Sequence, residues 1–340
     1  MRTRILIINV NWLGDVLFST PAIRAIRKKY PQAFIACLVP PRCSGLLKNN
    51  PYLNEVIEAE DRIPFYSFWR HIQVISMLKK RHFDTAILFH RSKTKALWAL
   101  AAGIPERAGY AGLGREGFLT LSYPNPDGAL HRTDYFLNLL HKLGIPEDGR
   151  EPDFYPKKEA EHELVKLLET HGLKAGEPYA VVHAGGNWLL KRWPAGYFMK
   201  WAELFLERYP WKIILCGTGS EKAVADEISA HFKNGRVISF CGKTSLDALA
   251  LLLKNSQMLL TNDSGPIHLA ATQGARIVGL FGPTSPELTG PISRGKTLIL
   301  KKDVGCEIPC YYRSCDLRVC MDWLKPEEVF EKTAKWLDIP

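Results

Sequence analysis

The sequence has no apolar run long enough to cross a lipid bilayer, for which roughly 18 residues are needed. Its opening apolar run, Ile5 to Val10, is ended by Asn11 and the pair Gly14-Asp15. It also has no short-period repeat, no low-complexity segment and no stretch typical of a signal peptide. These absences exclude a membrane-spanning protein and a solenoid, and we expect a globular protein that stays in the cytoplasm.

Two common nucleotide-binding motifs are missing as well. The loop after the first predicted strand, Asn11 to Asp15, is not G-x-G-x-x-G, and the glycine-bearing segment 183–194 is neither that motif nor a P-loop. The first absence counts against a dinucleotide-dependent oxidoreductase, although two doubly wound domains could support one. No nucleic-acid-binding module is recognisable, so the net charge of +10 favours phosphates or anionic lipid over nucleic acid as the partner.

The cysteines lack the C-x2-C pairs that are usual in zinc ribbons and knuckles. Four of the eight, Cys306, Cys310, Cys315 and Cys320, lie within fifteen residues, but they are separated by three, four and four residues. Proteins of a reducing compartment normally keep their thiols free. We therefore expect free thiols and no metal or cofactor, with a zinc ion or an iron–sulfur cluster at these four cysteines as the alternative.

What the sequence does have is apolar mass for two cores, since 46% of its 340 residues are hydrophobic. Short aliphatic segments alternate with segments of helical periodicity in both halves, which predicts parallel sheets with crossover helices. We predict two Rossmann-like, doubly wound α/β domains, 1–172 and 173–324, facing across a cleft, and a final amphipathic helix in 325–340. The predicted strands begin at Arg4, Phe34, Thr85, Tyr179, Trp211, Val237, Met258 and Arg276.

Three predicted strand-to-helix loops combine glycine with polar residues at the carboxyl ends of strands, where open α/β sheets bind ligands. In the first loop, Asp15 either caps the following helix or accepts a proton from a substrate hydroxyl. In the second, Gly186 frees backbone amides for an anion, and Lys191 either neutralises a diphosphate or faces water. In the third, the helix that follows Asp263 directs its first N–H groups at a ligand, which suits a diphosphate.

Together these motifs resemble those of the ADP-heptose lipopolysaccharide heptosyltransferases, a family of glycosyltransferases. They run in the family order over nearly the whole chain: Asn11-Trp12-Leu13-Gly14-Asp15 with Ser19-Thr20-Pro21, Lys191-Arg192-Trp193-Pro194, Asn262-Asp263-Ser264-Gly265-Pro266 with His268, and Phe281-Gly282-Pro283-Thr284. The closing pattern is similar to the tail of the second-heptose enzymes in particular, in Cys310, Arg313, Cys315 and Cys320-Met321.

The resemblance implies a GT-B fold, with an acceptor-binding first domain, a donor-binding second domain and a final helix that packs back on the first. It implies inverting, metal-independent transfer of heptose from ADP-L-glycero-D-manno-heptose to the lipopolysaccharide inner core, with Asp15 as general base and Lys191 stabilising the ADP leaving group. The second heptose is the expected step. The alternatives are a related transferase with another nucleotide sugar or acceptor, and a nucleotide-binding protein without catalysis. The implied donor-binding residues are Gly186, Asn187, Lys191, Glu221, Asp263, Ser264, Gly265, Pro266 and His268.

The implied acceptor is a lipid A-core molecule at the inner membrane, and its phosphates suit the basic surplus of the chain. We therefore expect the protein to act at the periphery of the cytoplasmic face of that membrane. The aromatic stretch Phe65-Tyr66 with Phe68-Trp69 is expected in core or inter-element contacts rather than at lipid. The candidate acceptor-binding residues of the first domain are Arg62, Arg91, Lys93, Arg107, Arg115 and His131.

Overall fold

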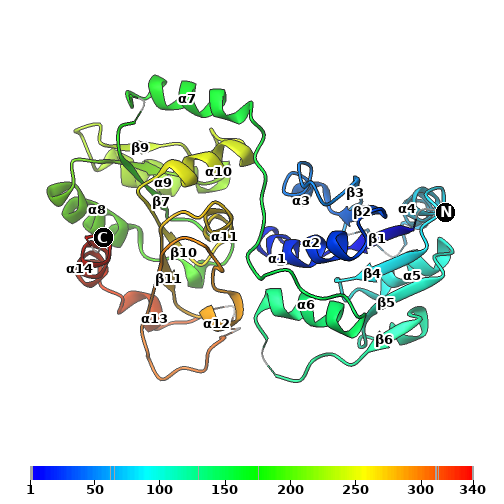
Figure 1. The fold of residues 1–340 in the computed structure, drawn as a ribbon. Coiled ribbons are helices and arrows are strands. Elements are labelled where there is room, and N and C mark those ends of the chain that lie inside the picture. Colours follow the sequence, from blue (N-terminus) through cyan, green and yellow to red (C-terminus); the bar gives the residue numbers. More distant parts are fainter. Residues whose placement is uncertain are drawn as a thin grey trace. The chain divides into compact units, whose positions relative to one another are not determined.

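The computed structural model describes residues 3–61, 63–64, 66–128, 130–174, 176–310, 312 and 314–338. The chain forms two compact units, Met1–Tyr155 and Pro156–Pro340, and each is built on one parallel six-stranded sheet (Figure 1). Within the described ranges, no helix is both long enough and apolar enough to cross a membrane.

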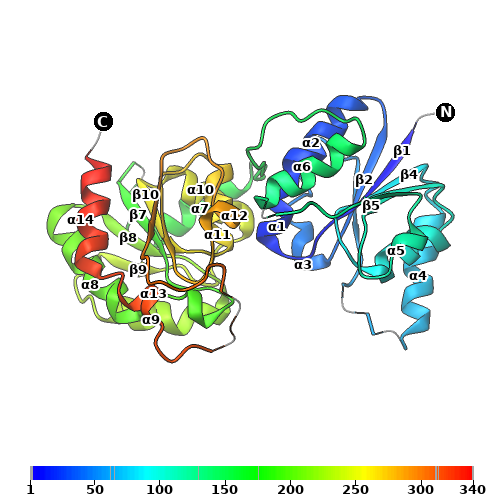
Figure 2. The ribbon, with the colours of Figure 1, turned by 90° about the horizontal axis from the view of Figure 1, so that it is seen from below.

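The first unit contains the strands Arg4–Ile8 (β1), Phe34–Val39 (β2), Glu55–Glu58 (β3), Thr85–Leu88 (β4), Glu106–Tyr110 (β5) and Leu121–Tyr123 (β6). Its helices are Leu13–Phe18 (α1), Thr20–Lys29 (α2), Pro41–Ser44 (α3), Phe68–Lys79 (α4), Lys93–Ala101 (α5) and Arg132–Lys142 (α6), with the 3-10 turn Glu116–Phe118 (η1). The sheet order is β3-β2-β1-β4-β5-β6. Helices α1, α2 and α6 pack together on one side of the sheet, and α4 packs on α5 on the other (Figure 2). Because helices cover both faces, β1 and β2 are almost wholly aliphatic and buried.

The second unit contains the strands Tyr179–His183 (β7), Lys212–Leu215 (β8), Val237–Ser239 (β9), Met258–Asn262 (β10), Ile277–Phe281 (β11) and Thr297–Lys301 (β12). Its helices are Ala160–Thr170 (α7), Ala195–Arg208 (α8), Lys222–Ala230 (α9), Leu246–Asn255 (α10), Gly265–Thr272 (α11), Pro286–Thr289 (α12), Val319–Asp322 (α13) and Pro326–Leu337 (α14), with the 3-10 turns Leu189–Lys191 (η2) and Gly219–Glu221 (η3). The sheet order is β12-β11-β10-β7-β8-β9. Helix α8 packs against α9 and α14, and α10 packs against α7 and α11.

Both sheets have the same topology, because each reads 3-2-1-4-5-6 when its strands are numbered along the chain. The strand order therefore reverses between β1 and β4 in the first sheet and between β7 and β10 in the second. Sheets of this kind bind ligands at the carboxyl ends of the strands on either side of the reversal. The loops that follow these four central strands are the expected positions of a site.

The structure confirms the two doubly wound domains and the eight predicted strands. The sequence pattern does not predict β3, β5, β6 or β12. Three of these are edge strands and β5 lies next to an edge. Their weak signal has a physical cause, because β3 is bounded by glutamates and β5 contains a glycine and two charged residues.

The domain boundary in the structure differs from the predicted one. The boundary lies between Tyr155 and Pro156 rather than at 172–173, because α7 packs against α10 and so belongs to the second unit. The final helix, α14, packs against α8, and its Val329 is buried in the core of the second unit. Its buried residues therefore belong to the core of the second unit, and the packing of this helix on the first domain stays a prediction.

Candidate functional site

A lysine and an aspartate from two different loops meet at the strand-order reversal of the second sheet. Lys191 ends the turn η2 after β7, and Asp263 directly follows β10. The Nζ of Lys191 donates to Oδ2 of Asp263 at 2.8 Å. The carboxylate side chain is 4% exposed and the lysine side chain 24%. The pair therefore presents a partly exposed cation that is held by a buried carboxylate.

Asn262, the last residue of β10, fixes the loop that carries this lysine. Its Oδ1 accepts the backbone N–H of Trp193 at 3.0 Å, and its Nδ2 donates to the carbonyl of Gly185 at 2.9 Å. Trp193 is itself buried, and its indole N–H donates to the carbonyl of Leu324 at 2.8 Å. The loop after β7 is thus tied to β10 at both ends, with Lys191 between the two ties.

Helix α11 begins beside the lysine–aspartate pair with its first turn uncapped by any described side chain. Ser264 occupies the N-cap position in an extended conformation, but its hydroxyl lies 3.0 Å from Nδ1 of His183 instead of bonding a helix N–H. A side-chain carbon built at Gly265 meets no described atom within 4 Å, so the space over the first turn is open. Pro266 follows in the first turn, where its missing N–H is tolerated. The positive end of α11 is therefore available to an anion.

Glu221 lies in a pocket lined by glycines, on the loop after β8. Its Oε1 lies 3.1 Å from Nε2 of His183, and its Oε2 accepts the amide of Thr218 at 2.8 Å. A Cβ at Gly185 would lie 1.7 Å from Oε1, so a larger residue there would displace the carboxylate. Burial of Glu221 opposes ionisation, but the hydrogen bond and charge of His183 and the Thr218 bonds outweigh it and lower the pKa of Glu221 to about 2. A fixed carboxylate of this kind can accept hydrogen bonds from sugar hydroxyls.

The remaining predicted donor residues lie around the same strand ends. His268, on α11, is 5% exposed, and its Nε2 lies 4.0 Å from Oδ1 of Asp263. Gly186 is buried, and its carbonyl accepts Nε of Arg192 at 2.7 Å. Asn187 follows it on the loop and is exposed. The structure therefore places all of the predicted donor residues on α11 and on the loops that follow β7, β8 and β10.

In the first unit, Asp15 lies at the carboxyl end of β1, as predicted. It is the third residue of α1, whose N-cap is Trp12, so the interpretation of Asp15 as the N-cap is wrong. Its side chain is 21% exposed, and its Oδ1 lies 3.5 Å from Nε of Arg132. A carboxylate in this position can accept a proton from a hydroxyl.

Lys95 is a residue of this region that the sequence pattern did not single out. It is 4% exposed on α5, and its Nζ donates to Oδ1 of Asn11 at 2.6 Å and to the carbonyl of Asn9 at 3.3 Å. Burial lowers the pKa of Lys95 to about 8. Lys95 therefore holds the loop between β1 and Asp15 through hydrogen bonds to Asn9 and Asn11. Its place on the apolar face of α5, three residues before Trp98, is the signal that could have found it.

The predicted acceptor role of two arginines needs correction. Arg115 is fully buried, and its Nε donates to the carbonyl of Tyr110 at 2.7 Å. Nε of Arg107 donates to the carbonyl of Phe118 at 2.7 Å. Both guanidinium groups donate to backbone carbonyls of their own unit, and Arg115 is therefore not presented to a ligand, whereas Arg107 is partly exposed.

The other acceptor candidates have different surroundings. Arg91 and Lys93 are exposed, on the loop after β4 and at the start of α5. His131 is 9% exposed and is the N-cap of α6, where its Nδ1 accepts the amide of Thr133 at 3.2 Å. Arg62 lies outside the described residues. Arg91 and Lys93 are therefore the candidates that keep a solvent-facing position.

The aromatic stretch before and within α4 is exposed, contrary to expectation. Tyr66 is 86% exposed, Phe68 65% and Trp69 76%. Phe68 and Trp69 contact each other edge to face, with ring centroids 6.0 Å apart. The expected core contacts are therefore wrong for these three residues, and Phe65 lies outside the described residues.

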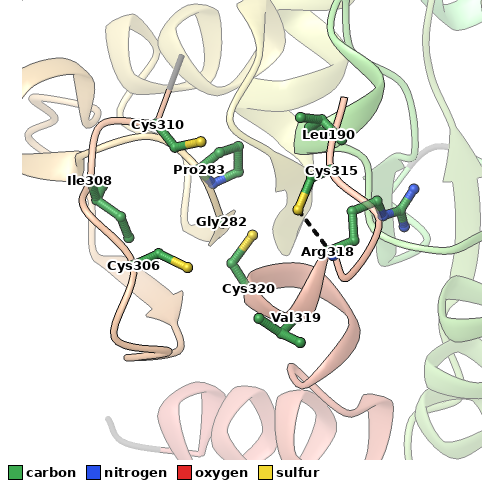
Figure 3. Close-up of a pocket in the computed structure, with 10 residues that line it drawn as sticks. All are labelled: Leu190, Gly282, Pro283, Cys306, Ile308, Cys310, Cys315, Arg318, Val319 and Cys320. Atoms are coloured by element: carbon green, nitrogen blue, oxygen red, sulfur yellow. Dashed lines mark hydrogen bonds between the residues drawn. The ribbon is translucent and has the colours of Figure 1, made fainter. Parts of the chain in front are cut away.

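One pocket of the second unit is lined by all four closing cysteines (Figure 3). The four are free thiols, and the backbone N–H of Arg318 donates to Sγ of Cys315 at 3.4 Å. Among the described residues, no group of three or more His, Cys, Asp or Glu side chains is arranged to hold a metal ion. The residues drawn around the pocket include Leu190, Gly282, Pro283, Cys306, Cys310, Cys315 and Cys320.

The chemistry of the two regions is different. The second unit offers a lysine and an open helix start, which suit two phosphates, beside two fixed carboxylates that suit sugar hydroxyls. This combination fits a nucleoside diphosphate that carries a sugar. The first unit offers a carboxylate at the end of its own central strand and exposed cations on the next loop, which suits a hydroxyl-bearing, anionic molecule.

Known proteins resemble this chain over most of its length. The family model of glycosyltransferase family 9 (heptosyltransferase) matches residues 71–318. Lipopolysaccharide heptosyltransferase 2 of Escherichia coli is 27% identical over 306 residues, which are 87% of this chain and 87% of the relative. Lipopolysaccharide heptosyltransferase 1 of Pseudomonas aeruginosa is 25% identical and covers 92% of this chain and 87% of its own. The solved structure of the E. coli ADP-heptose lipopolysaccharide heptosyltransferase II has a TM-score of 0.82 at 24% identity, covers 98% of both chains and has the same GT-B-like fold.

Proposed function

Because the chain belongs to glycosyltransferase family 9, the heptosyltransferase family, we propose that it transfers heptose from ADP-L-glycero-D-manno-heptose to the inner core of lipopolysaccharide. The observation that carries this proposal is the Lys191–Asp263 pair beside the open start of α11, since cation and helix together suit the diphosphate of a nucleotide sugar. ADP-heptose is the donor in the name of a relative with the same fold, which supports the choice of nucleotide and sugar.

In the proposed reaction, a hydroxyl of the acceptor attacks the anomeric carbon of the heptose, ADP leaves, and the configuration at that carbon inverts. Asp15 takes the proton of the attacking hydroxyl. Lys191 and the first N–H groups of α11 stabilise the negative charge that develops on the leaving diphosphate, so the reaction needs no metal ion. Asp263 contacts the heptose, and Glu221 accepts hydrogen bonds from the ribose.

The second heptose is the step that we propose. The run Lys191-Arg192-Trp193-Pro194 and the closing cysteine pattern support this choice, since both are similar to second-heptose enzymes. The relatives include enzymes named heptosyltransferase 1, 2 and 3, at 25%, 27% and 24% identity, so the step has to be measured.

The acceptor is a lipid A-core molecule, and we propose that the protein meets it at the periphery of the cytoplasmic face of the inner membrane. Arg91 and Lys93 are the exposed cations of the first unit that are proposed to contact its phosphates. No nucleic acid and no resident cofactor have a role in this reaction.

Turnover of ADP-heptose on two lipopolysaccharide acceptors tests the proposal. One acceptor lacks heptose and the other carries a single heptose. We expect transfer to the single-heptose acceptor, at the same rate in excess chelator as in magnesium. Transfer only to the heptose-free acceptor would support heptose transfer but show that the protein adds the first heptose and not the second. Absence of transfer to both acceptors, or a strict need for a divalent cation, would contradict the proposed function.

A further inference from the structure

His183 connects the two ends of the candidate nucleotide site, although no motif gives it a role. It is the last residue of β7 and is 2% exposed. Its Nε2 lies 3.1 Å from Oε1 of Glu221, and its Nδ1 lies 3.0 Å from Oγ of Ser264. One buried imidazole therefore contacts both the residue proposed for the ribose and a residue proposed for the phosphates.

The carboxylate of Glu221 determines which ring nitrogen of His183 carries a proton. An ionised Glu221 can only accept hydrogen bonds, so Nε2 of His183 carries a proton and donates a hydrogen bond to this carboxylate. The hydroxyls of Ser264 and Thr261 face the other ring nitrogen, Nδ1, at 3.0 and 3.3 Å, and a hydroxyl can donate to this nitrogen or accept from it. The orientation of the ring is therefore fixed from both sides.

This arrangement also changes what Ser264 can do. A serine at an N-cap normally accepts a hydrogen bond from the first turn of its own helix. In this site its hydroxyl faces His183 at 3.0 Å and the carbonyl of Asn262 at 3.1 Å, and no described side chain caps α11. The imidazole thus contributes to keeping the helix start open for an anion.

We propose that His183 is a positioning residue that holds the two ends of the nucleotide site in register. Through Nε2 it orients Glu221 for the ribose, and through Nδ1 it turns Ser264 away from α11 so that the helix start can bind the diphosphate. The inference rests on the nucleotide-sugar function proposed above and assigns the residue that organises the same site.

The two ring nitrogens can be tested separately with amide side chains. Glutamine at position 183 reaches the position of Nε2, and asparagine reaches that of Nδ1. Adenosine serves as a probe of the ribose end, inorganic pyrophosphate as a probe of the phosphate end, and ADP as a probe of both. Affinities are measured by calorimetry for ADP, and by competition against ADP for the two half-ligands, on the full chain.

We expect His183→Ala to weaken ADP binding at least about tenfold, because a buried carboxylate loses a charged hydrogen bond and Ser264 can cap its helix. His183→Gln should restore adenosine binding but not pyrophosphate binding, and His183→Asn should do the reverse. This split is the readout that a merely structural role would not produce.

The matched control is His231→Gln, because His231 also pairs with a glutamate of the second unit, at 2.7 Å from Oε1 of Glu203, but on the surface. ADP affinity should not change in this variant. Thermal unfolding checks that each variant folds, and the two amide variants keep the test open if His183→Ala does not.

Three outcomes would overturn the inference. Unchanged ADP affinity in all three His183 variants would remove the positioning role. Equal losses of adenosine and pyrophosphate binding in the Gln and Asn variants would reduce His183 to a packing residue. A wild-type protein that binds none of the three probes would overturn the proposed function, and this inference with it.

Discussion

The two units share one topology, but the charged groups of their candidate sites are held in different ways. In the second unit, each buried charge has an ionisable partner: Lys191 pairs with Asp263, and Glu221 with His183. In the first unit, the buried Lys95 donates to neutral oxygens, and its pKa is lowered to about 8. The site of the second unit is therefore electrostatically compensated before any ligand arrives, whereas the site of the first unit contains, besides the Asp15–Arg132 ion pair, a cation that is costly to bury.

The two units also differ in net charge. Residues 1–155 contain 21 Lys and Arg against 14 Asp and Glu, so this unit carries +7 of the total of +10. The second unit has 24 basic against 21 acidic residues. A site whose charged side chains are already paired suits a nucleotide that binds in one defined position. A basic surface suits a large anionic acceptor.

The largest expected effect separates chemistry from donor binding. In Asp15→Asn, transfer should fall by about a thousandfold, because the proposed general base is removed, while ADP affinity stays unchanged. Initial rates of transfer and ADP titrations measure the two quantities. Asp134→Asn is the control, since Asp134 is a surface aspartate of the same unit that pairs with Arg150. Full activity of Asp15→Asn would remove the base from the first unit.

Lys191→Met should change binding and chemistry together. The variant loses the cation next to the diphosphate and leaves Asp263 buried without it, so we expect ADP affinity and turnover each to fall by about tenfold to a hundredfold. Lys200→Met is the matched control, because Lys200 forms an exposed ion pair with Glu203. If ADP affinity were normal in Lys191→Met, the compensated pair would not belong to the donor site.

The buried cation of the first unit predicts a dependence of stability on pH. The pKa of Lys95 is lowered from 10.5 to about 8, so between these pH values the unfolded chain binds a proton that the folded chain does not. The contribution of Lys95 to the free energy of unfolding should therefore rise with pH across this window, by about 3 kcal/mol, and the difference in free energy of unfolding between the wild type and Lys95→Met should change by this amount.

Urea unfolding of the wild type and of Lys95→Met, at pH 7 and again near pH 10.5, measures this difference. Lys79→Met serves as the control, because Lys79 is exposed at the end of α4. If the free energies of unfolding of wild type and Lys95→Met differed by the same amount at both pH values, burial would not lower the pKa of Lys95.

The smallest expected effect is on the basic surface of the first unit. Replacing Arg91 and Lys93 together by alanine should raise the KM for the lipopolysaccharide acceptor severalfold at low salt, with kcat and ADP affinity unchanged. The effect should shrink as salt is added, because both side chains are exposed. A change in ADP affinity instead would place these cations on the donor side.

The sequence predicts best what depends on local pattern. Strand β7 is predicted to the residue, because both of its faces are buried and it reads as one apolar run before His183. The loops with Asp15, Lys191 and Asp263 are found in the same way, since each follows a predicted strand. Edge strands such as β3 escape, because their polar ends resemble a loop.

The partners of buried polar side chains could not be predicted, because they are far apart in the chain. His183 contacts Glu221 and Ser264 at separations of 38 and 81 residues, and no local pattern reports such contacts. Arg115 shows the opposite error, because an arginine on a glycine-rich loop reads as a surface cation and is in fact fully buried. Tertiary contacts decide both cases.

Calorimetric titration of the full chain with ADP, UDP, GDP and NAD, without acceptor and without metal, addresses the compensated site of the second unit directly. We predict saturable binding of ADP and weaker or undetectable binding of the other three. Preference for UDP, GDP or NAD over ADP would contradict an ADP-heptose donor and the proposed roles of Lys191 and α11.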